Sequence, residues 1–387
     1  MKNFYKKMIA ASMIISALNF TPNFDLEEFQ IVSSVAHAED QANDKSDLAE
    51  KKFKEGNEFY KQNKYSEAIR AYTEAISLNP NSAEAYYNRG NTYYDFQKYD
   101  QAINDYDKAI ELNPNNAKVY YVRGLTYVNL QKYNQAIDDF NKVIESNPDL
   151  AALYINRGDA YFELQKYDQA IADYSKAILL NPNYAEAYNN RGIAYKELQK
   201  YDQAISDYNR VISLNPNDAE AYYNRGIAYF DLQKYDQAIA DYNKAIEINP
   251  NYAKVYYNRG NAYNNLRKYE QAIADYNKVI ELDPNYAPAY NNRGIEYYLL
   301  QKYDQAIADF NKAIEINPNE ATYYLRGTTY YQLQKYDQAI SDYSKLIELK
   351  PNDVNAYQGR GLCYQALGEN DKAQADFAKA KELGYPK

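Results

Sequence analysis

Residues 83–116 read AEAYYNRGNTYYDFQKYDQAINDYDKAIELNPNN, and this stretch decides the fold. Tyr86, Gly90 and Tyr93 follow one another at i, i+4 and i+7, the spacing of one face of an α-helix. A second segment repeats that spacing with Ala102, Tyr106 and Ala109. The stretch therefore predicts two amphipathic helices in succession.

The residues around the two segments indicate where each helix ends. Gln97 to Asp100 separate the segments, so we expect the turn there, with Asp100 as the N-cap of the second helix. Pro114 has no N–H and cannot continue that helix. Asn115 and Asn116 follow it and can cap the next helix.

The same pattern returns along almost the whole 387-residue chain. Most of its glycines recur every 34 residues, with a single interval of 33, at Gly56, Gly90, Gly124, Gly158, Gly192, Gly226, Gly260, Gly294, Gly327 and Gly361. Prolines keep the same interval. A period of this length is typical of a stacked array, which forms one elongated domain of any length. The missing residue lies between Pro318 and Gly327, where we expect a local change of superhelical twist.

A glycine inside a helix requires a structural reason, because it costs roughly 1 kcal/mol relative to alanine. We expect a second backbone to lie close over each one, with Ala102 facing Gly90. The structural glycines are Gly90, Gly124, Gly158, Gly192, Gly226 and Gly260. The two helices would then pack tightly as an antiparallel hairpin.

The pattern resembles the tetratricopeptide repeat, which places an aromatic residue, Gly, an aromatic residue, Ala, an aromatic residue, Ala and Pro at these spacings. The resemblance covers ten repeats, at residues 49–82, 83–116, 117–150, 151–184, 185–218, 219–252, 253–286, 287–319, 320–353 and 354–387. It implies an all-α fold, a right-handed superhelical solenoid of antiparallel helix pairs. It also implies a concave groove lined by the first helix of each pair, where members of the family bind peptides or partner proteins.

The chain departs from the family's pattern just before the glycine, where Arg replaces the usual Leu. These residues are Arg89, Arg123, Arg157, Arg191, Arg225, Arg259, Arg293, Arg326 and Arg360. An Asp follows sixteen residues after every one, and the first repeat lacks both partners. We therefore predict an Arg–Asp pair inside each repeat from the second onward, with Arg225 and Asp241 as one example.

The resemblance also implies which side chains face the groove. They are Tyr87, Asn91, Tyr94, Tyr121, Asp159, Phe162, Glu163, Glu197, Tyr223, Phe230, Asp231, Tyr257, Asn261 and Tyr324. Aromatic rings supply contact area and amides bond to backbone groups, which suits an extended chain. The alternative for each ring is that it only covers a neighbouring helix. The chain also has 48 tyrosines, an excess that codon drift in an AT-rich genome would explain equally well.

Two features of the groove bear on the ligand. Its acidic middle stretch favours a neutral or basic segment. Some family members clamp a C-terminal carboxylate with five donors, of which this chain lacks two, since Phe53 and Val122 stand at those places. We therefore do not expect recognition of chaperone tails.

The N-terminus has the pattern of a signal peptide over residues 1–38. Lys2, Lys6 and Lys7 precede an apolar stretch that is too short to span a bilayer, and Ala36-His37-Ala38 offers a cleavage site. Earlier cleavage, an uncleaved membrane anchor and a cytosolic protein are the alternatives. Residues 39–48 are polar and form a flexible linker in this interpretation. The protein would then be exported to the periplasm, the cell surface or the medium.

The composition argues against catalysis and against metal or cofactor binding. The single histidine is His37, which cleavage would remove, and the single cysteine is Cys363, so common nucleophile–base pairs and most zinc sites are excluded. No phosphate-binding loop occurs, and a net charge of −9 without a basic block argues against nucleic acid. We expect no cofactor, no metal and no enzymatic activity. The leading hypothesis is a scaffold for a peptide or protein partner, with a glycan-binding module second and an enzyme or enzyme accessory third.

Overall fold

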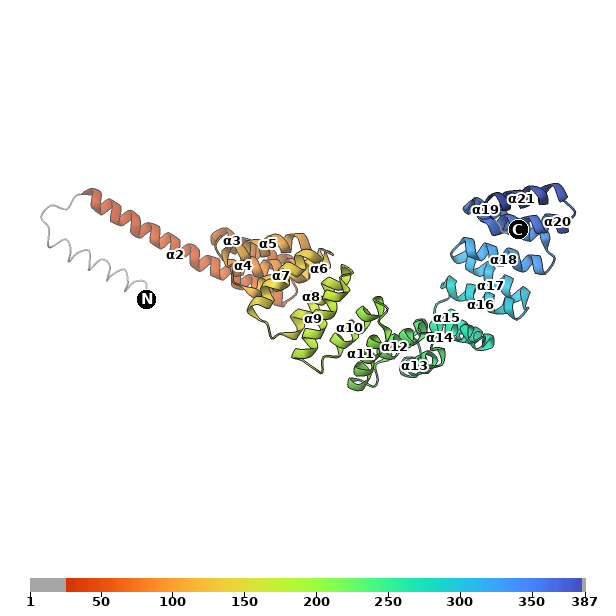
Figure 1. Ribbon diagram of the computed structural model, residues 1–387. Coiled ribbons are helices and arrows are strands. Elements are labelled where there is room, and N and C mark those ends of the chain that lie inside the picture. The colour runs from red at the N-terminus through yellow and green to blue at the C-terminus, as the bar shows by residue number, and fades with distance from the viewer. Residues whose placement is uncertain (1–25, 385–387) are drawn as a thin grey trace. The chain divides into compact units, whose positions relative to one another are not determined.

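The computed structural model describes residues 26–384, and in these residues it contains twenty helices and no strand (Figure 1). Within each of the two compact units described next, the two helices of a repeat pack together as a hairpin. The prediction of an all-α array of antiparallel helix pairs is confirmed.

The helices belong to two compact units, which meet at Leu164 and Gln165. The first unit contains α2 (Leu26–Lys61), α3 (Tyr65–Leu78), α4 (Ala83–Asp95), α5 (Tyr99–Leu112), α6 (Ala117–Asn129), α7 (Tyr133–Ser146) and α8 (Ala151–Glu163). The second contains α9 (Tyr167–Leu180), α10 (Ala185–Glu197), α11 (Tyr201–Leu214), α12 (Ala219–Asp231), α13 (Tyr235–Ile248), α14 (Ala253–Asn265), α15 (Tyr269–Leu282), α16 (Ala287–Leu299), α17 (Tyr303–Ile316), α18 (Glu320–Gln332), α19 (Tyr336–Leu349), α20 (Val354–Ala366) and α21 (Asn370–Glu382). Within each unit every helix packs against the next one along the chain.

The turn inside each hairpin is tighter than the sequence predicts. Helix α4 ends at Asp95, Gln97 has a left-handed φ of 59°, and α5 already begins at Tyr99. The Gln97 N–H donates to Tyr94 O and the Lys98 N–H donates to Tyr93 O, which is the Schellman arrangement of a helix C-terminus. The expectation that Asp100 is an N-cap is wrong, because Lys98 holds that place and Asp100 lies in the first turn of α5.

The expected caps of the first helices are present where a short polar side chain is available. The Asn116 side chain accepts from the Lys118 N–H at the start of α6. Asp218 and Asn319 cap α12 and α18 in the same way. Pro288 lies in the first turn of α16, where its missing N–H breaks no helical hydrogen bond.

The core of each hairpin is formed by small residues around one large ring. In the second repeat, Ala102, Tyr106 and Ala109 are fully buried. The repeated glycine leaves room for this ring rather than for a second backbone. A Cβ added at Gly90 would lie 2.6 Å from Cε1 of Tyr106, so Ala102 is not the facing residue. The sequence analysis missed this because it treated the ring as filling the core rather than lying across the glycine.

Helix α2 runs through the segment that the sequence analysis assigned to a flexible linker. It continues from Leu26 to Lys61 and extends well beyond α3, with which its C-terminal part pairs (Figure 1). Residues 41–48 are exposed, and Ala49 is the first buried residue of the segment from 41 onward. Residues 39–48 contain neither Pro nor Gly, so nothing in them stops the helix. Most of the predicted signal segment, residues 1–25, lies outside the described residues.

The deletion between the eighth and ninth repeats shortens the link from α17 to α18. Asn319 there has φ −145° and ψ 158°, whereas the equivalent Asp218 has φ −88° and ψ 97°. The more extended backbone spans the gap left by the missing residue. The accompanying change of superhelical twist stays a prediction.

Candidate functional site

In eight repeats the first helix is fixed by an Arg that binds on two sides. Arg225 donates from Nε and Nη2 to the two carboxylate oxygens of Asp241, at 2.8 and 2.6 Å. Its third donor, Nη1, reaches Asn209 Oδ1 on the second helix of the preceding repeat. The Arg therefore joins its own hairpin to the one before it.

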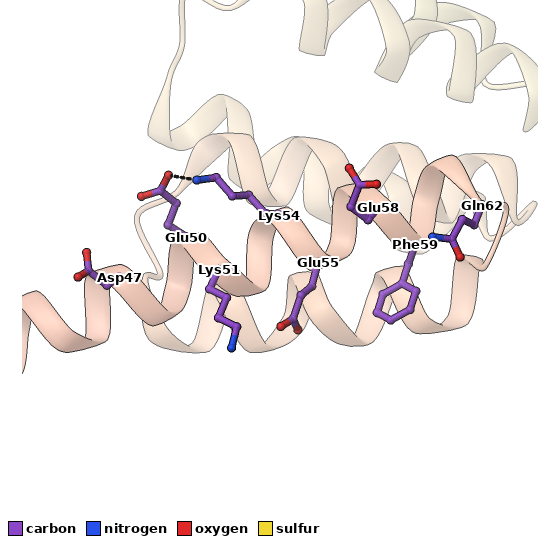
Figure 2. Close-up of a pocket in the computed structure, with 8 residues that line it drawn as sticks. All are labelled: Asp47, Glu50, Lys51, Lys54, Glu55, Glu58, Phe59 and Gln62. Atoms are coloured by element: carbon purple, nitrogen blue, oxygen red, sulfur yellow. Dashed lines mark ion pairs between the residues drawn. The ribbon is translucent and has the colours of Figure 1, made fainter.

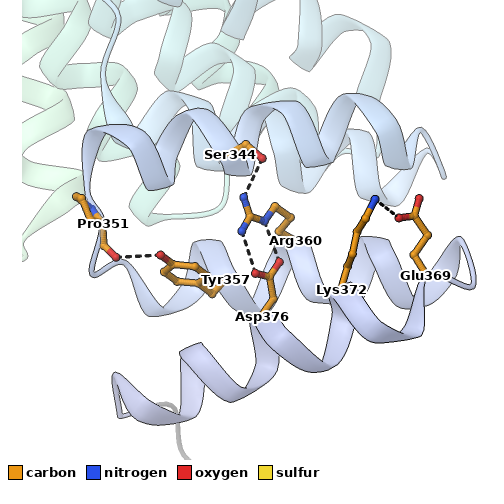
Figure 3. A network of polar contacts seen from close by, with 7 residues as sticks. All are labelled: Ser344, Pro351, Tyr357, Arg360, Glu369, Lys372 and Asp376. Carbon is orange, nitrogen blue, oxygen red and sulfur yellow. Dashed lines mark hydrogen bonds and ion pairs between the residues drawn. The ribbon is translucent and has the colours of Figure 1, made fainter.

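The arrangement is the same in eight repeats. In the last one, Figure 3 shows Arg360 between Asp376 and Ser344, with Ser344 on the preceding hairpin. The other pairs that follow the predicted spacing join Arg89 to Asp105, Arg123 to Asp139, Arg191 to Asp207, Arg259 to Asp275, Arg293 to Asp309 and Arg326 to Asp342. Arg157 and Asp173 belong to different units, and their pairing stays a prediction.

The first repeat lacks the Arg for a reason that the structure makes plain. No hairpin precedes it among the described residues, so a third donor would have no acceptor. Glu55 stands in its place and pairs with Lys52, which also pairs with Glu74 of α3. The bridging Arg thus begins at the first repeat that has a neighbour on that side.

The predicted groove side chains lie on the first helices and remain accessible to different degrees. All fourteen are half-buried or exposed. The tyrosines at the fifth position of each repeat lean on the second helix of their own hairpin. The ring centroids of Tyr223 and Tyr242 are 6.3 Å apart, and those of Tyr257 and Tyr276 are 6.0 Å apart. Each ring also has an aromatic neighbour at the end of its repeat, Tyr252 at 5.2 Å from Tyr223 and Tyr286 at 5.4 Å from Tyr257.

Asparagines connect these tyrosines from one first helix to the next. Asn258 Nδ2 donates to the Tyr223 hydroxyl at 3.0 Å, and Asn292 Nδ2 donates to the Tyr257 hydroxyl at 3.1 Å. Asn156 binds Tyr121 in the same way in the first unit. Each of these hydroxyls accepts an amide N–H here, and an accepting hydroxyl still has its own O–H proton to donate.

Two predicted groove residues have a structural task. Asn91 Oδ1 accepts from the buried Tyr106 hydroxyl, and Asn261 Oδ1 accepts from the Tyr276 hydroxyl. Burial raises the pKa of both tyrosines, so these hydroxyls stay protonated and donate. For a ligand, Asn91 and Asn261 offer their amide N–H groups rather than their oxygens.

Two pockets of similar size open beside the first helices, one in each unit. The Lys118 pocket of the first unit has a volume of about 650 Å³ and the Lys254 pocket of the second about 500 Å³. Each has two tyrosines from consecutive repeats and one lysine in its wall. These residues are Tyr87, Tyr121 and Lys118 in the first pocket, and Tyr223, Tyr257 and Lys254 in the second. Four of the predicted groove residues are thus brought together in pairs, and the others line neither pocket.

The sequence analysis missed the outer walls of these pockets. Leu150 and Tyr286 occupy the same place in their repeats, and Tyr286 packs edge-on against Tyr257 at 5.4 Å. Leu150 is 55% exposed, unusual for a large apolar side chain. The signal in the sequence was the motif AKVYY, which occurs only at residues 117–121 and 253–257.

A third recess follows α2 and is lined by that helix alone. Figure 2 shows its side chains, from Asp47 to Gln62, projecting from one helix with Glu50 and Lys54 paired. Charges of both signs alternate along it. This is a solvated helix surface, and it holds no convergent set of groups.

One carboxyl group is buried at a position where no other repeat buries one. Glu296 on α16 is fully buried, whereas the equivalent Glu58 of the first repeat is exposed and the other repeats have Thr, Ala or Cys there. Its Oε1 accepts from Asn264 Nδ2, and its Oε2 has no partner among the described residues. Burial raises its pKa to about 7. Burial likewise raises the pKa of the Cys363 thiol, to about 12, so that thiol is a packed group rather than a nucleophile.

Residues 26–384 contain no cluster of three or more His, Cys, Asp or Glu side chains that could hold a metal ion. None of their helices combines the length and the apolar character needed to cross a bilayer.

The fold and this face define the class: a helical repeat protein that presents a row of accessible aromatic and amide groups along its first helices. Signatures described as "Tetratricopeptide repeat" match residues 83–150, 219–320 and 354–383, and one described as "TPR repeat" matches residues 56–97, 158–233 and 327–368. The chain therefore belongs to the tetratricopeptide repeat family, whose members generally act as protein-interaction scaffolds.

Individual proteins resemble parts of the chain. A stretch of 40 residues is 60% identical to the DnaJ homolog subfamily C member 7 homolog of Schizosaccharomyces pombe, covering 10% of this chain and 8% of that protein. The C-terminal part of a TPR repeat-containing protein from Cytophaga hutchinsonii has 21% identity and a TM-score of 0.54, covering 62% of this chain and 98% of that one. YrrB, a TPR protein with an unusual peptide-binding site, has 26% identity and a TM-score of 0.42, covering 47% and 94%.

Proposed function

We propose that this protein is a non-catalytic scaffold that holds an extended segment of a partner protein against its first helices. The observation that carries the proposal is the row of tyrosine hydroxyls that accept an amide N–H and keep their own proton for a ligand. An extended peptide offers a carbonyl oxygen at every residue, which such donors can bind. The half-buried rings beside them supply apolar contact area.

The proposal includes export and a role in assembly of the cell envelope. Its support is the N-terminal pattern of lysines, apolar stretch and small residues. Cleavage after Ala38 would remove the first part of α2 and keep the part from Ala49 onward that packs on α3. N-terminal sequencing of the protein from fractionated cells tests this directly, and a cytosolic protein that begins at Met1 would contradict it.

Isothermal titration with a pool of extended peptides and, separately, with cell-wall oligosaccharides tests the binding function. We expect saturable binding of peptides that weakens in Tyr223→Ala and Tyr257→Ala. The matched control is Tyr235→Ala on the second helix α13. Saturable binding of the oligosaccharide that the same two substitutions abolish would instead identify a glycan-binding module.

A further inference from the structure

The two lysine pockets are the same structure, repeated four repeats apart. Lys254 and Tyr257 stand 136 residues after Lys118 and Tyr121, and Tyr223 stands 136 residues after Tyr87. Val143 and Val279 form equivalent parts of the two walls. Only in these two places do two successive repeats both have Tyr as their fifth residue while the later repeat has Lys as its second residue. Since the repeats between them differ, the 34-residue period alone does not produce the pockets.

The walls of both pockets suit an apolar side chain. Two tyrosine rings form part of each wall, and Val143 or Val279 forms another part. In the first pocket Val122 stands where Asn258 brings an amide to the second. Volumes of about 500 and 650 Å³ accommodate a large aliphatic or aromatic side chain with its flanking backbone.

The lysines add a charge to this apolar site. Lys118 is the only charged residue in the wall of its pocket. Most exposed lysines of the second helices pair with a Glu three residues on, as Lys142 and Lys312 do. Lys118 and Lys254 have no carboxylate within ion-pair distance in the described part of the chain. Each pocket thus has an unused cation beside tyrosine hydroxyls that can donate a hydrogen bond, which is the complement of a carboxylate.

Resting on the proposed function, we propose that each pocket binds the same short internal motif, an aromatic or large aliphatic side chain next to an Asp or Glu. The partner is a protein segment that carries two copies of this motif. One copy enters the Lys118 pocket in the first unit, and the other enters the Lys254 pocket in the second. Two weak sites joined by one chain bind with an effective concentration set by the linker, so the pair binds more tightly than either site alone.

One difference between the two pockets determines which of them binds the acidic motif more tightly. Asp283 lines the Lys254 pocket where Asn147 lines the Lys118 pocket. An acidic motif meets a like charge only in the second, so the Lys118 pocket is the tighter site. The substitution Asp283→Asn makes the second pocket resemble the first and strengthens it.

The probe is the blocked peptide acetyl-Gly-Ser-Asp-Phe-Gly-Ser-amide, which has no terminal carboxylate. It is titrated calorimetrically into the full chain, beside peptides with Lys-Phe or Asp-Ser in place of Asp-Phe. Peptides with two Asp-Phe motifs and a series of Gly-Ser linkers follow. The variants are Lys118→Gln, Lys254→Gln, the double variant and Asp283→Asn. The control is the double variant Lys142→Gln, Lys312→Gln, which removes the same charge from second helices.

We expect two sites for the Asp-Phe peptide, each weakened roughly tenfold by its own lysine substitution, the size of one lost charge-assisted hydrogen bond. Asp283→Asn tightens the weaker site, and the best two-motif peptide binds at least about tenfold more tightly than the single motif. Three results would contradict the proposed motif. They are equal binding of the Lys-Phe and Asp-Phe peptides, wild-type affinity in the double variant Lys118→Gln, Lys254→Gln, and no binding of the Asp-Phe peptide. If the peptide pool still binds in those cases, the scaffold proposal stands; if it does not, both are wrong.

Discussion

At the scale of the residue, the central ring of each hairpin and the side chain facing it vary together. Tyr106 faces Asn91 and Tyr276 faces Asn261, and each hydroxyl donates to the amide oxygen. Where the facing residue is apolar, the ring is usually Phe. The pairs of this kind are Leu125 with Phe140, Ile295 with Phe310 and Leu362 with Phe377. A polar group buried without a partner costs free energy, which explains the pairing.

The fifth and sixth repeats break this rule, because Ile193 and Ile227 are apolar but the rings are Tyr208 and Tyr242. Tyr208 is buried, but Ile193 faces it, and its hydroxyl has no partner among the described residues. We predict that Tyr208→Phe leaves the free energy of unfolding unchanged or raises it by about 1 kcal/mol, because the substitution removes an unpaired group. Tyr106→Phe should lower it by about 1 kcal/mol. Urea unfolding of the two variants is the measurement, and equal losses would contradict the account.

The helical glycines give a second comparison between matched positions. A Cβ at Gly226 would lie 2.6 Å from Cε1 of the buried Tyr242, whereas at Gly327 the nearest ring atom is 3.2 Å away. Alanine gains about 1 kcal/mol of helix propensity at either position, and overpacking costs about 1–3 kcal/mol. Gly226→Ala should therefore destabilise the protein, and Gly327→Ala should be close to neutral. Thermal unfolding that ranks the two variants in the opposite order would refute this explanation of the glycines.

Glu296 makes the second unit sensitive to pH. Its carboxyl has an ordinary pKa of 4.5 and a pKa of about 7 in the folded protein, because burial disfavours the charged form. Between these values the folded state holds a proton that the unfolded state has lost, so stability falls as the pH rises. The loss is roughly 3 kcal/mol in total and is complete above about pH 7.

The substitution Glu296→Gln tests this dependence, because the amide resembles the protonated acid in shape. We expect the variant and the wild type to be similar in stability near pH 4.5 and the variant to be more stable above pH 7. The comparison also cancels the titration of the Asp carboxyls of the Arg–Asp pairs. A stability difference that does not change with pH would mean that Glu296 is not buried as described.

At the scale of the helix, the Arg–Asp pair joins neighbouring hairpins as well as the two helices of one hairpin. Removing Arg225 leaves the buried Asp241 without its partner and Asn209 without its donor. We predict a loss of about 3–5 kcal/mol for Arg225→Ala, as for other broken buried pairs. Asp241→Ala should also destabilise, and the double variant should lose much less than the sum of the two. Additive losses, measured by urea unfolding, would count against direct pairing.

The sequence predicted these elements well because their period is strong. The helix pairs, their approximate ends and the partner of each Arg all follow from the 34-residue spacing. The turns were misplaced because their structure depends on backbone conformation: Gln97, at a left-handed φ, carries no sequence signal comparable to the glycine at Gly368 in the last repeat. The third bond of Arg225 was missed because its acceptor position varies between Asn, Asp, Thr and Ser, although Asn is the most frequent, so the position does not stand out in the repeat.

At the scale of the whole molecule, the array brings side chains from different repeats together, and here the sequence was a weaker guide. Spacing along one helix predicted that the tyrosines share a face. It did not predict that Leu150, at the end of one repeat, closes a pocket with Tyr87 from the preceding repeat. Such contacts depend on how one hairpin packs on the next. Glu296 was missed although its position is buried in other repeats, as Thr92 and Ala262 show, because a single Glu was taken as part of a solvated helix surface.

The central claim is that the first-helix face binds an extended peptide, and site-specific photocrosslinking tests it most directly. A photoreactive residue is placed at Tyr94 or Tyr324 on the first helices, or at Lys108 or Lys312 on the exposed side of second helices. Each protein is irradiated with the peptide pool, and the adducts are measured by mass spectrometry. The account predicts peptide adducts at positions 94 and 324 and few at 108 and 312. Equal labelling of both faces, or labelling of the second helices alone, would contradict it.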